Sequence, residues 1–324
     1  MKQGVMLMNP FLIAVIAVGT LILIVLLIAF ICFRLTFYIK DKDKKSNEEF
    51  PIPVGKIYEP WRDIMVGWMK ETRALKHQVF TIKTFDGLTL CAKYYEQTPG
   101  APIELMFHGY RGYAERDLCG GVQRCFALGH NAFIVDQRAG GDSEGNVITF
   151  GINEHKDCLC WVDFLVEHFG PTVQIYLTGI SMGASTVLNA AGCPLPQNVV
   201  GVLADCGFTS PADIIKKVIK DMKLPPVIVY PFIQLGARLY GHFSISAVSS
   251  VDMIKNCTLP VIFFHGDDDA FVPWEMSKRN YEACSSRKKL VTIHGAGHGL
   301  CYPVAPEHYL QEVRDFFYPS KILT

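Results

Sequence analysis

The sequence lacks an excess of charge of either sign and lacks the spacings by which proteins hold zinc. Among its 324 residues, 31 basic and 31 acidic side chains give a formal net charge of zero, and the basic residues are dispersed apart from one cluster after residue 33. Proteins that bind nucleic acid usually carry a basic patch or stripe. The sequence contains no C-x-x-C pair, no Cys/His zinc spacing and no internal repeat. It therefore predicts no nucleic-acid partner and no metal site.

The cysteines do not form the even, loop-based pattern of a disulfide framework. Their number, 11, is odd, and several fall within expected strands or helices: Cys91, Cys158, Cys160 and Cys206. Disulfides are rare in reducing compartments, where free cysteines behave as small buried apolar residues. We therefore expect reduced, buried thiols.

One apolar run is long enough to cross a membrane. Residues 11–33 carry no charge, and as a helix these 23 residues would be about 34 Å long, against a hydrocarbon core of about 30 Å. A cleaved signal peptide is the alternative, but its apolar region usually has about 7–15 residues and ends near an A-x-A-like site, which is missing here. We expect a short tail over residues 1–10 and a transmembrane helix over residues 11–33 that contacts the lipid bilayer.

The charges beside this run predict its orientation. Only Lys2 precedes it, whereas five basic residues follow it: Arg34, Lys40, Lys42, Lys44 and Lys45. Positively charged flanks stay in the cytoplasm, so we expect a single-pass protein of the cell membrane whose domain lies on the cytoplasmic side. Contact of the lysine cluster with anionic head groups is the alternative to an ordinary stop-transfer flank.

Residues 34–74 predict a juxtamembrane linker followed by a helix. Residues 41–56 are charged and contain proline, and a helix is expected over residues 58–74, with Pro60 in its first turn. Six apolar residues fall on one face of this helix: Ile57, Trp61, Ile64, Met65, Trp68 and Met69. Two placements fit that face, the membrane surface or the following domain. The scarcity of Lys and Arg on the opposite face favours the domain.

The remaining apolar segments predict an α/β domain over residues 75–318, with a tail over residues 319–324. A hairpin is expected around Asp86-Gly87. Six apolar strands then alternate with segments of helical length: residues 103–107, 132–135, 173–177, 199–204, 261–264 and 290–293. Continuous apolar strands indicate a parallel sheet that is buried on both faces.

The pentapeptide Gly179-Ile-Ser181-Met-Gly183 is the most informative motif. It stands between an apolar strand, residues 173–178, and a stretch of small residues, 184–191, which is the strand–turn–helix setting of a nucleophile elbow. The turn strains the serine backbone, and a Cβ at either glycine would collide with the neighbouring strand or helix. We therefore expect Ser181 to be a nucleophile, with Gly179 and Gly183 as the elbow glycines.

Two further motifs follow apolar strands later in the chain: HGDDDAFVP at 265–273 and HGAGHG at 294–299. Serine, then acid, then histidine is the chain order of an α/β-hydrolase. With HGY at 108–110 and DQRAGGDSEG at 136–145, where Ala139 replaces the usual glycine, residues 75–318 resemble the serine-aminopeptidase and lysophospholipase-like branch of the α/β-hydrolase superfamily. The resemblance implies an eight-stranded, mostly parallel sheet flanked by helices.

The resemblance also implies roles for the motif residues. His298 would be the base that takes the proton of Ser181, with His294 as its competitor. Asp269 would orient His298, because Val272-Pro273 sets the register of its motif. The competitors of Asp269 are three other carboxylates: Asp267, Asp268 and Asp205.

Two backbone amides, those of Tyr110 and Met182, would form the oxyanion hole. Acyl transfer of this kind needs no metal and no organic cofactor, so none is expected. In this superfamily an insert at about residues 208–253 carries the lid, and the apolar, proline-containing run at 225–236 indicates a small helical lid that binds an acyl group. Because the insert is short, we expect a fairly open site.

Together these features predict a membrane-anchored serine hydrolase. It would cleave carboxylic ester or thioester bonds of acyl, lipid-like or small apolar substrates through an acyl-enzyme on Ser181. The alternative within the class is an aminopeptidase-type peptidase on the same three residues. The alternative from another class is a hydrolase fold that binds without catalysis.

Overall fold

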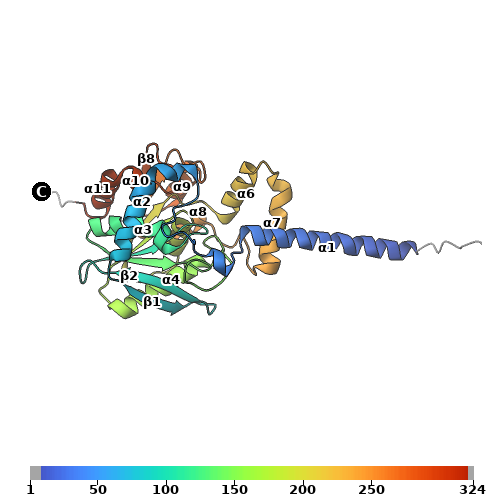
Figure 1. Ribbon diagram of the computed structural model, residues 1–324, viewed down its shortest axis with the longest axis horizontal. Helices are drawn as coiled ribbons and strands as arrows, with labels where there is room; N and C mark the ends of the chain where they lie inside the picture. Colours follow the sequence, from blue (N-terminus) through green and yellow to red (C-terminus); the bar gives the residue numbers. More distant parts are fainter. Residues whose placement is uncertain (1–8, 320–324) are drawn as a thin grey trace, which may run out of the picture.

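The computed structural model describes residues 9–319, which form a domain with one long helix projecting from it (Figure 1). The expected N-terminal tail lies almost wholly outside the described residues, as do Lys2 and most of the expected C-terminal tail. The projecting helix, α1 (Pro10–Thr36), is the one element of residues 9–319 that is long and apolar enough to cross a bilayer.

The domain is built on one sheet of eight strands in the order β1-β2-β4-β3-β5-β6-β7-β8. β1, β2 and β4 pair antiparallel, and the remaining neighbours pair parallel. The strands are β1 Gln78–Lys83, β2 Thr89–Tyr95, β3 Ile103–Phe107, β4 Asn131–Asp136, β5 Ile175–Ile180, β6 Val199–Asp205, β7 Val261–Gly266 and β8 Lys288–Ile293. The predicted fold, a hairpin leading into a mostly parallel sheet, is confirmed.

Successive residues of a strand point to opposite faces of the sheet, so these apolar strands have two apolar faces. Helices cover both faces. The helices of the domain core are α3 Ala114–Ala127, α4 Glu154–Phe169, α5 Met182–Ala191, α8 Ser250–Met253, α9 Trp274–Ala283, α10 Cys301–Val304 and α11 Pro306–Phe317. In β3, Leu105 and Phe107 pack with α4 and α5, whereas Met106 packs with α3 on the other face. Every residue of β3 is buried, as expected for a strand covered on both sides.

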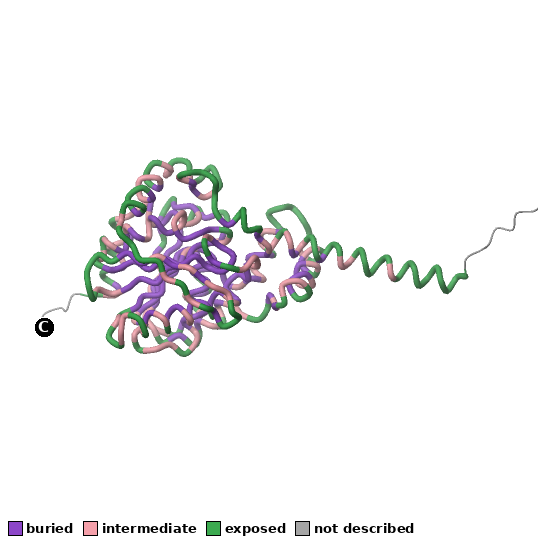
Figure 2. The backbone as a smooth tube through the Cα atoms, turned by 60° about the horizontal axis from the view of Figure 1, so that its bottom comes forward, coloured by how far each residue is buried: buried purple, intermediate pink, exposed green. Residues whose placement is uncertain are grey.

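The first part of the insert between β6 and β7 forms two helices, the second of which packs against α1. α6 (Pro211–Asp221) begins after Ser210, whose hydroxyl accepts the amide of Asp213 at 3.0 Å and so caps the helix. α7 (Pro226–Tyr240) begins at a proline pair and packs against the end of α1 nearer the domain (Figure 1). Most of α1 is exposed, and its buried residues, Ala29 and Phe33, lie in this last part of the helix (Figure 2).

The segment that follows α1 is bound to the domain rather than free. Tyr38 forms an isolated antiparallel bridge with Val147. Lys44 is buried and donates to the carbonyl of Ser143 at 3.2 Å, and Lys45 pairs with a carboxylate oxygen of Asp142 at 2.5 Å. Two lysines of the predicted membrane flank are therefore bound by the domain.

The helix expected over residues 58–74 is a 3₁₀ helix, Lys56–Trp61, followed by α2, Arg62–Ala74. Met65 and Met69 of α2 are buried against Cys119 of α3 and against Leu300. Of the two placements considered from the sequence, the structure has the one in which this helix packs on the domain.

Candidate active site

Ser181 stands between the end of β5 and the start of α5 in a strained backbone conformation. Its φ and ψ are 57° and −118°, a combination that non-glycine residues rarely adopt. A Cβ on Gly179 would overlap the carbonyl of Gly183, and a Cβ on Gly183 would overlap the carbonyl of Phe107. The backbones of β3, β5 and α5 therefore meet so closely at this turn that only glycine fits on either side of Ser181.

Ser181, His298 and Asp269 form a chain of hydrogen bonds. Oγ of Ser181 lies 2.9 Å from Nε2 of His298, and Nδ1 of His298 lies 2.7 Å from Oδ2 of Asp269. An ionised carboxylate only accepts, so Nδ1 carries the ring proton and Nε2 accepts from the serine hydroxyl. The loops after β5, β7 and β8 thus bring together the three side chains that the sequence predicted to act together.

Asp269 is held as an anion. Its Oδ1 accepts the amides of Phe271 and Val272 at 2.9 and 2.8 Å, and Nε2 of His265 lies 3.2 Å from Oδ2. Burial alone would raise the pKa of Asp269, but hydrogen bonds from His265 and His298 outweigh it and hold the pKa well below its usual range. The sequence did not single out His265, because it appears there only as the first residue of a turn.

The other two aspartates of the motif lie away from the serine. Asp267 and Asp268 are exposed, and Oδ2 of Asp267 accepts from Nδ1 of His294 at 2.7 Å. The His294 side chain is 99% exposed. This pair is therefore a surface contact at the end of β8, and His294 does not approach Ser181.

Asp205, the third competitor, is buried but has other partners. Its Oδ2 accepts from the hydroxyl of Tyr309 at 3.3 Å, and burial raises the pKa of its carboxyl group. Its backbone carbonyl accepts the amide of Ser181 at 2.8 Å, so Asp205 supports the elbow through its main chain.

The loop at residues 108–110 lies directly beside Ser181. A Cβ on Gly109 would be 3.5 Å from Cβ of Ser181, and Oδ2 of Asp117 accepts the Gly109 amide at 3.3 Å. Tyr110 follows in this loop, and Met182 opens α5. No acceptor within residues 9–319 bonds the amide of either Tyr110 or Met182. Both amides are therefore available to a ligand atom.

The same loop also holds the carboxyl end of α1. The hydroxyl of Tyr110 donates to the carbonyl of Thr36 at 2.7 Å, and Arg111 donates to the carbonyls of Leu35 and Tyr38 at 2.9 and 3.3 Å. The last carbonyls of a helix have no partners within the helix. These bonds supply such partners and join the projecting helix to the loop beside Ser181.

The loop at residues 136–145 is hydrogen-bonded to the loop at residues 108–110. The amide of Gln137 donates to Nε2 of buried His108 at 3.0 Å, and Arg138 pairs with Asp157 through Nε at 2.6 Å. Ala139, which replaces the usual glycine, has a positive φ of 62°. The substitution noted in the sequence therefore places an alanine in a backbone conformation that strains it.

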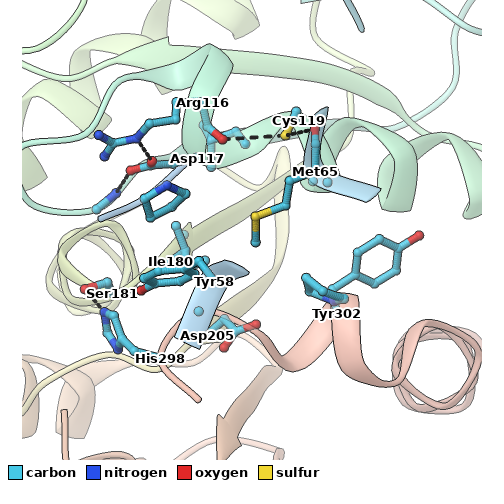
Figure 3. A pocket seen from close by; sticks show the side chains of 18 of the residues that line it. Tyr58, Met65, Arg116, Asp117, Cys119, Ile180, Ser181, Asp205, His298 and Tyr302 are labelled. Atoms are coloured by element: carbon cyan, nitrogen blue, oxygen red, sulfur yellow. Dashed lines mark hydrogen bonds and ion pairs between the residues drawn. The ribbon is translucent and has the colours of Figure 1, made fainter. Parts of the chain in front are cut away.

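A cavity of about 530 Å³ opens beside Ser181 and His298 (Figure 3). Part of its wall comes from residues 53–58 of the juxtamembrane segment and from Met65 and Trp68 of α2. Tyr58 lies close to Ile180 and Ser181 in the view of Figure 3. Its burial raises the pKa of the phenol, so the hydroxyl stays protonated.

None of the described residues that line this cavity comes from the insert at 208–253. The expected acyl-binding lid is therefore not part of the cavity wall, and the apolar side chains of the insert pack in a cluster with Phe33 and Phe37 that also contains Met182. Ser181 itself is only 7% exposed beside this cavity. The covering segment precedes the hydrolase motifs in the chain, so the motif spacing could not reveal it.

Two groups of side chains lie close enough to share an ion, but neither has a free donor set. Asp269 and His298 are joined to Ser181, and Cys206 beside them is buried with its pKa raised well above the usual range. In the group Glu104, Cys125 and His130, the carboxylate pairs with the guanidinium of Arg124, and a fixed cation repels a metal ion.

The chain is similar to several known proteins. The model of the prolyl oligopeptidase family matches residues 148–319, more than half of the chain. The uncharacterized protein YqkD of Bacillus subtilis is 28% identical over 58% of this chain and 62% of its own length. The lysophosphatidylserine lipase ABHD12 of Danio rerio is 25% identical over 61% of this chain and 52% of its own length. The chain thus spans less than two thirds of both relatives.

Solved structures share the fold. The Pyrococcus furiosus esterase PF2001 superposes with a TM-score of 0.63 and 21% identity, covering 82% of this chain and 95% of that protein. A Butyrivibrio proteoclasticus protein, Est1E, solved with ferulic acid bound, superposes with a TM-score of 0.55 and 21% identity, over 73% of this chain and 97% of that protein. The chain belongs to the prolyl oligopeptidase family and has the α/β-hydrolase fold.

Proposed function

We propose that Ser181 is the nucleophile of an acyl-transfer reaction and that the protein is a serine hydrolase. The observation that carries this proposal is the hydrogen-bonded chain from Ser181 through His298 to the anionic Asp269. A serine hydroxyl is too weak an acid to attack a carbonyl unaided, so a base has to take its proton. Nε2 of His298 takes it as Oγ attacks, and the Asp269 carboxylate offsets the positive charge that forms on the imidazole.

The tetrahedral intermediate then collapses to an acyl-enzyme. Its oxyanion accepts from the amides of Tyr110 and Met182, the two donors beside Ser181 that lack partners within the described residues. His298 passes its proton to the leaving alcohol or thiol, which departs. Water then attacks the acyl group with His298 again as base, and Ser181 regains its proton as the acid is released.

We propose an ester or thioester with an apolar acyl group as the substrate. The cavity wall beside Ser181 includes several apolar side chains, among them Met65, Trp68 and Ile180, which suit an acyl chain. The description of one relative as a lipase and of a structural neighbour as an esterase supports the same class. An aminopeptidase-type activity on the same three residues is the alternative that the family's description favours.

The anchor forms the second part of the proposal. We propose that α1 crosses the cell membrane once and that the hydrolase domain lies on its cytoplasmic side. The length and apolar character of α1 support the span. Arg34, the first charge of the helix, and the four lysines at residues 40–45 support the orientation.

The assignment of Ser181 is tested by labelling with a fluorophosphonate. The wild-type chain is expected to label, and Ser181→Ala is expected to lose the label together with turnover, by roughly 10⁶-fold, because no other nucleophile occupies the elbow. Turnover is measured on a panel of esters, thioesters and aminoacyl amides. Labelling that persists in Ser181→Ala would remove the nucleophile, and preference for aminoacyl amides would favour the peptidase.

The assignment of Asp269 is tested against its neighbour in the same motif. Asp269→Asn is expected to lower kcat by roughly 10³–10⁴-fold, because an amide neither stabilises the imidazolium nor enforces the tautomer of His298. Asp268→Asn, which changes an exposed residue one position away, is the matched control and is expected to stay within about twofold of wild type. A larger loss in Asp268→Asn than in Asp269→Asn would contradict the register of the motif.

The juxtamembrane wall of the cavity is tested at Tyr58. Tyr58→Ala is expected to lower the ratio of kcat/KM for a long-chain ester to that for a short-chain ester by about tenfold, because an aromatic surface in the cavity is lost. The short ester is the internal control, since a folding defect lowers both values together. An unchanged ratio would show that the acyl chain does not contact this wall.

The orientation is tested by proteolysis of intact cells that express the full chain with a C-terminal tag. The tag is expected to be protected in intact cells and digested once the membrane is permeabilised, because the positive flank holds the domain in the cytoplasm. Digestion in intact cells would place the domain outside and reverse the orientation.

A further inference from the structure

α7 is apolar over most of its surface, which is unusual for a helix on the outside of a domain. Among the 15 residues of PVIVYPFIQLGARLY, Arg238 is the only charged one. A helix that is apolar all round is normally buried in a large core or in a membrane. One face of α7 is buried within the protein, because Tyr230, Ile233 and Ala237 on that face are buried.

A second face of α7 packs against α1. A Cβ on Gly236 would overlap the carbonyl of Ala29, so the two helix backbones approach closely. The hydroxyl of Tyr240 donates to the carbonyl of Leu26 at 3.1 Å, and its ring meets that of Phe30 edge-on at 5.2 Å. The contact therefore covers the part of α1 from Leu26 onward.

A third face of α7 and the turn that precedes it are exposed. Val227, Ile228 and Leu239 of α7 are 83%, 60% and 44% exposed, and Met222 and Leu224 in the turn are 65% and 43% exposed. Positions 228, 231, 235 and 239 of α7 recur at helical spacing, so they form one stripe, and every residue on it is apolar. Such a contiguous patch marks a contact with a partner or a membrane.

The position at which α7 contacts α1 indicates how far the exposed patch of α7 would lie from the middle of a bilayer that α1 spans. Leu26 lies eight residues before Arg34, the first charge of α1, which is about 12 Å along the helix axis. Counted from Pro10, a span of about 20 residues ends near Ala29, beside Gly236 of α7. If α1 spans the membrane, α7 therefore lies at the boundary between acyl chains and head groups.

The charges around the patch suit the same position. Lys216, Lys220 and Lys223 are exposed on α6 and in the turn. The acids of α6 have partners within the protein: Asp221 pairs with Lys217 at 2.5 Å, and Asp213 with Arg279 at 3.4 Å. Exposed lysines beside an apolar face are typical of helices that lie in the interface of an anionic membrane.

We propose that the α6–α7 hairpin is a second membrane-binding element, which inserts its exposed apolar stripe into the lipid interface beside α1. The inference rests on the proposed anchor and adds to it a function for the insert. None of the insert's residues lines the cavity beside Ser181; the insert would hold the end of α1 nearer the domain and fix the domain against the bilayer. Together with the bonds from Tyr110 and Arg111 to the end of α1, it would hold the domain in one orientation on the membrane.

The proposal is tested with the full chain reconstituted in vesicles of phosphatidylcholine and phosphatidylglycerol. Ile228→Trp places an indole on the exposed stripe, and lipids brominated along the acyl chain quench only an indole that contacts them. Gln311→Trp, on exposed α11 at the far end of the domain from α1 (Figure 1), is the matched control. Each variant is compared with the parent chain, which already has four tryptophans.

Bromolipid is expected to quench the added fluorescence of Ile228→Trp and to leave that of Gln311→Trp unchanged. If bromolipid quenches the added fluorescence of neither variant, the inference is overturned. A blue-shifted emission of Ile228→Trp without quenching would also overturn it, because it would place the stripe against a second protein surface.

The same vesicles are washed at high salt and labelled with fluorophosphonate. If the parent chain stays bound to the vesicles and reacts with the fluorophosphonate while Ile228→Trp is not quenched, only the inference about α6 and α7 is contradicted. If the parent chain is washed off the vesicles, the proposed membrane anchor is contradicted as well.

Discussion

The close approach of three backbones around Ser181 is the constraint on which the rest of the site depends. Gly179 and Gly183 leave no room for a side chain, and Ser181 occupies a backbone conformation that an unconstrained chain avoids. The cost of that conformation is met by the buried sheet around it, where β3 and β5 are held on both sides. Because the turn is rigid, Oγ is held toward the loops after β7 and β8, which carry Asp269 and His298.

Electrostatics then separates carboxylates that look alike in the sequence. Asp269 and Asp205 are both buried near Ser181, yet hydrogen bonds from two histidines lower the pKa of Asp269, whereas burial raises that of Asp205. Asp269 also bonds Nδ1 of His298, so it is the carboxylate placed to stabilise a protonated imidazole. The difference arises from partners contributed by separate loops, with His265 as the one that the motif did not indicate.

The projecting helix and the site are physically joined. The loop beside Ser181 bonds the last carbonyls of α1, and the juxtamembrane segment continues into the wall of the cavity. The segment that leaves the proposed anchor therefore also shapes the space for the substrate. The insert, which occupies the position of a lid in the superfamily, packs its apolar side chains with α1 instead.

The sequence by itself determined the α/β fold, the elbow and the order of Ser181, Asp269 and His298, because these depend on local spacing: apolar runs, glycines beside a serine, and Val272-Pro273 setting a register. It also indicated that α2 packs on the domain, from the scarcity of Lys and Arg on its polar face. Only the tertiary structure decided what covers the cavity and where the insert lies. Composition shows that a segment is apolar, but which apolar surface it meets depends on contacts between residues far apart in the chain, such as Gly236 and Ala29.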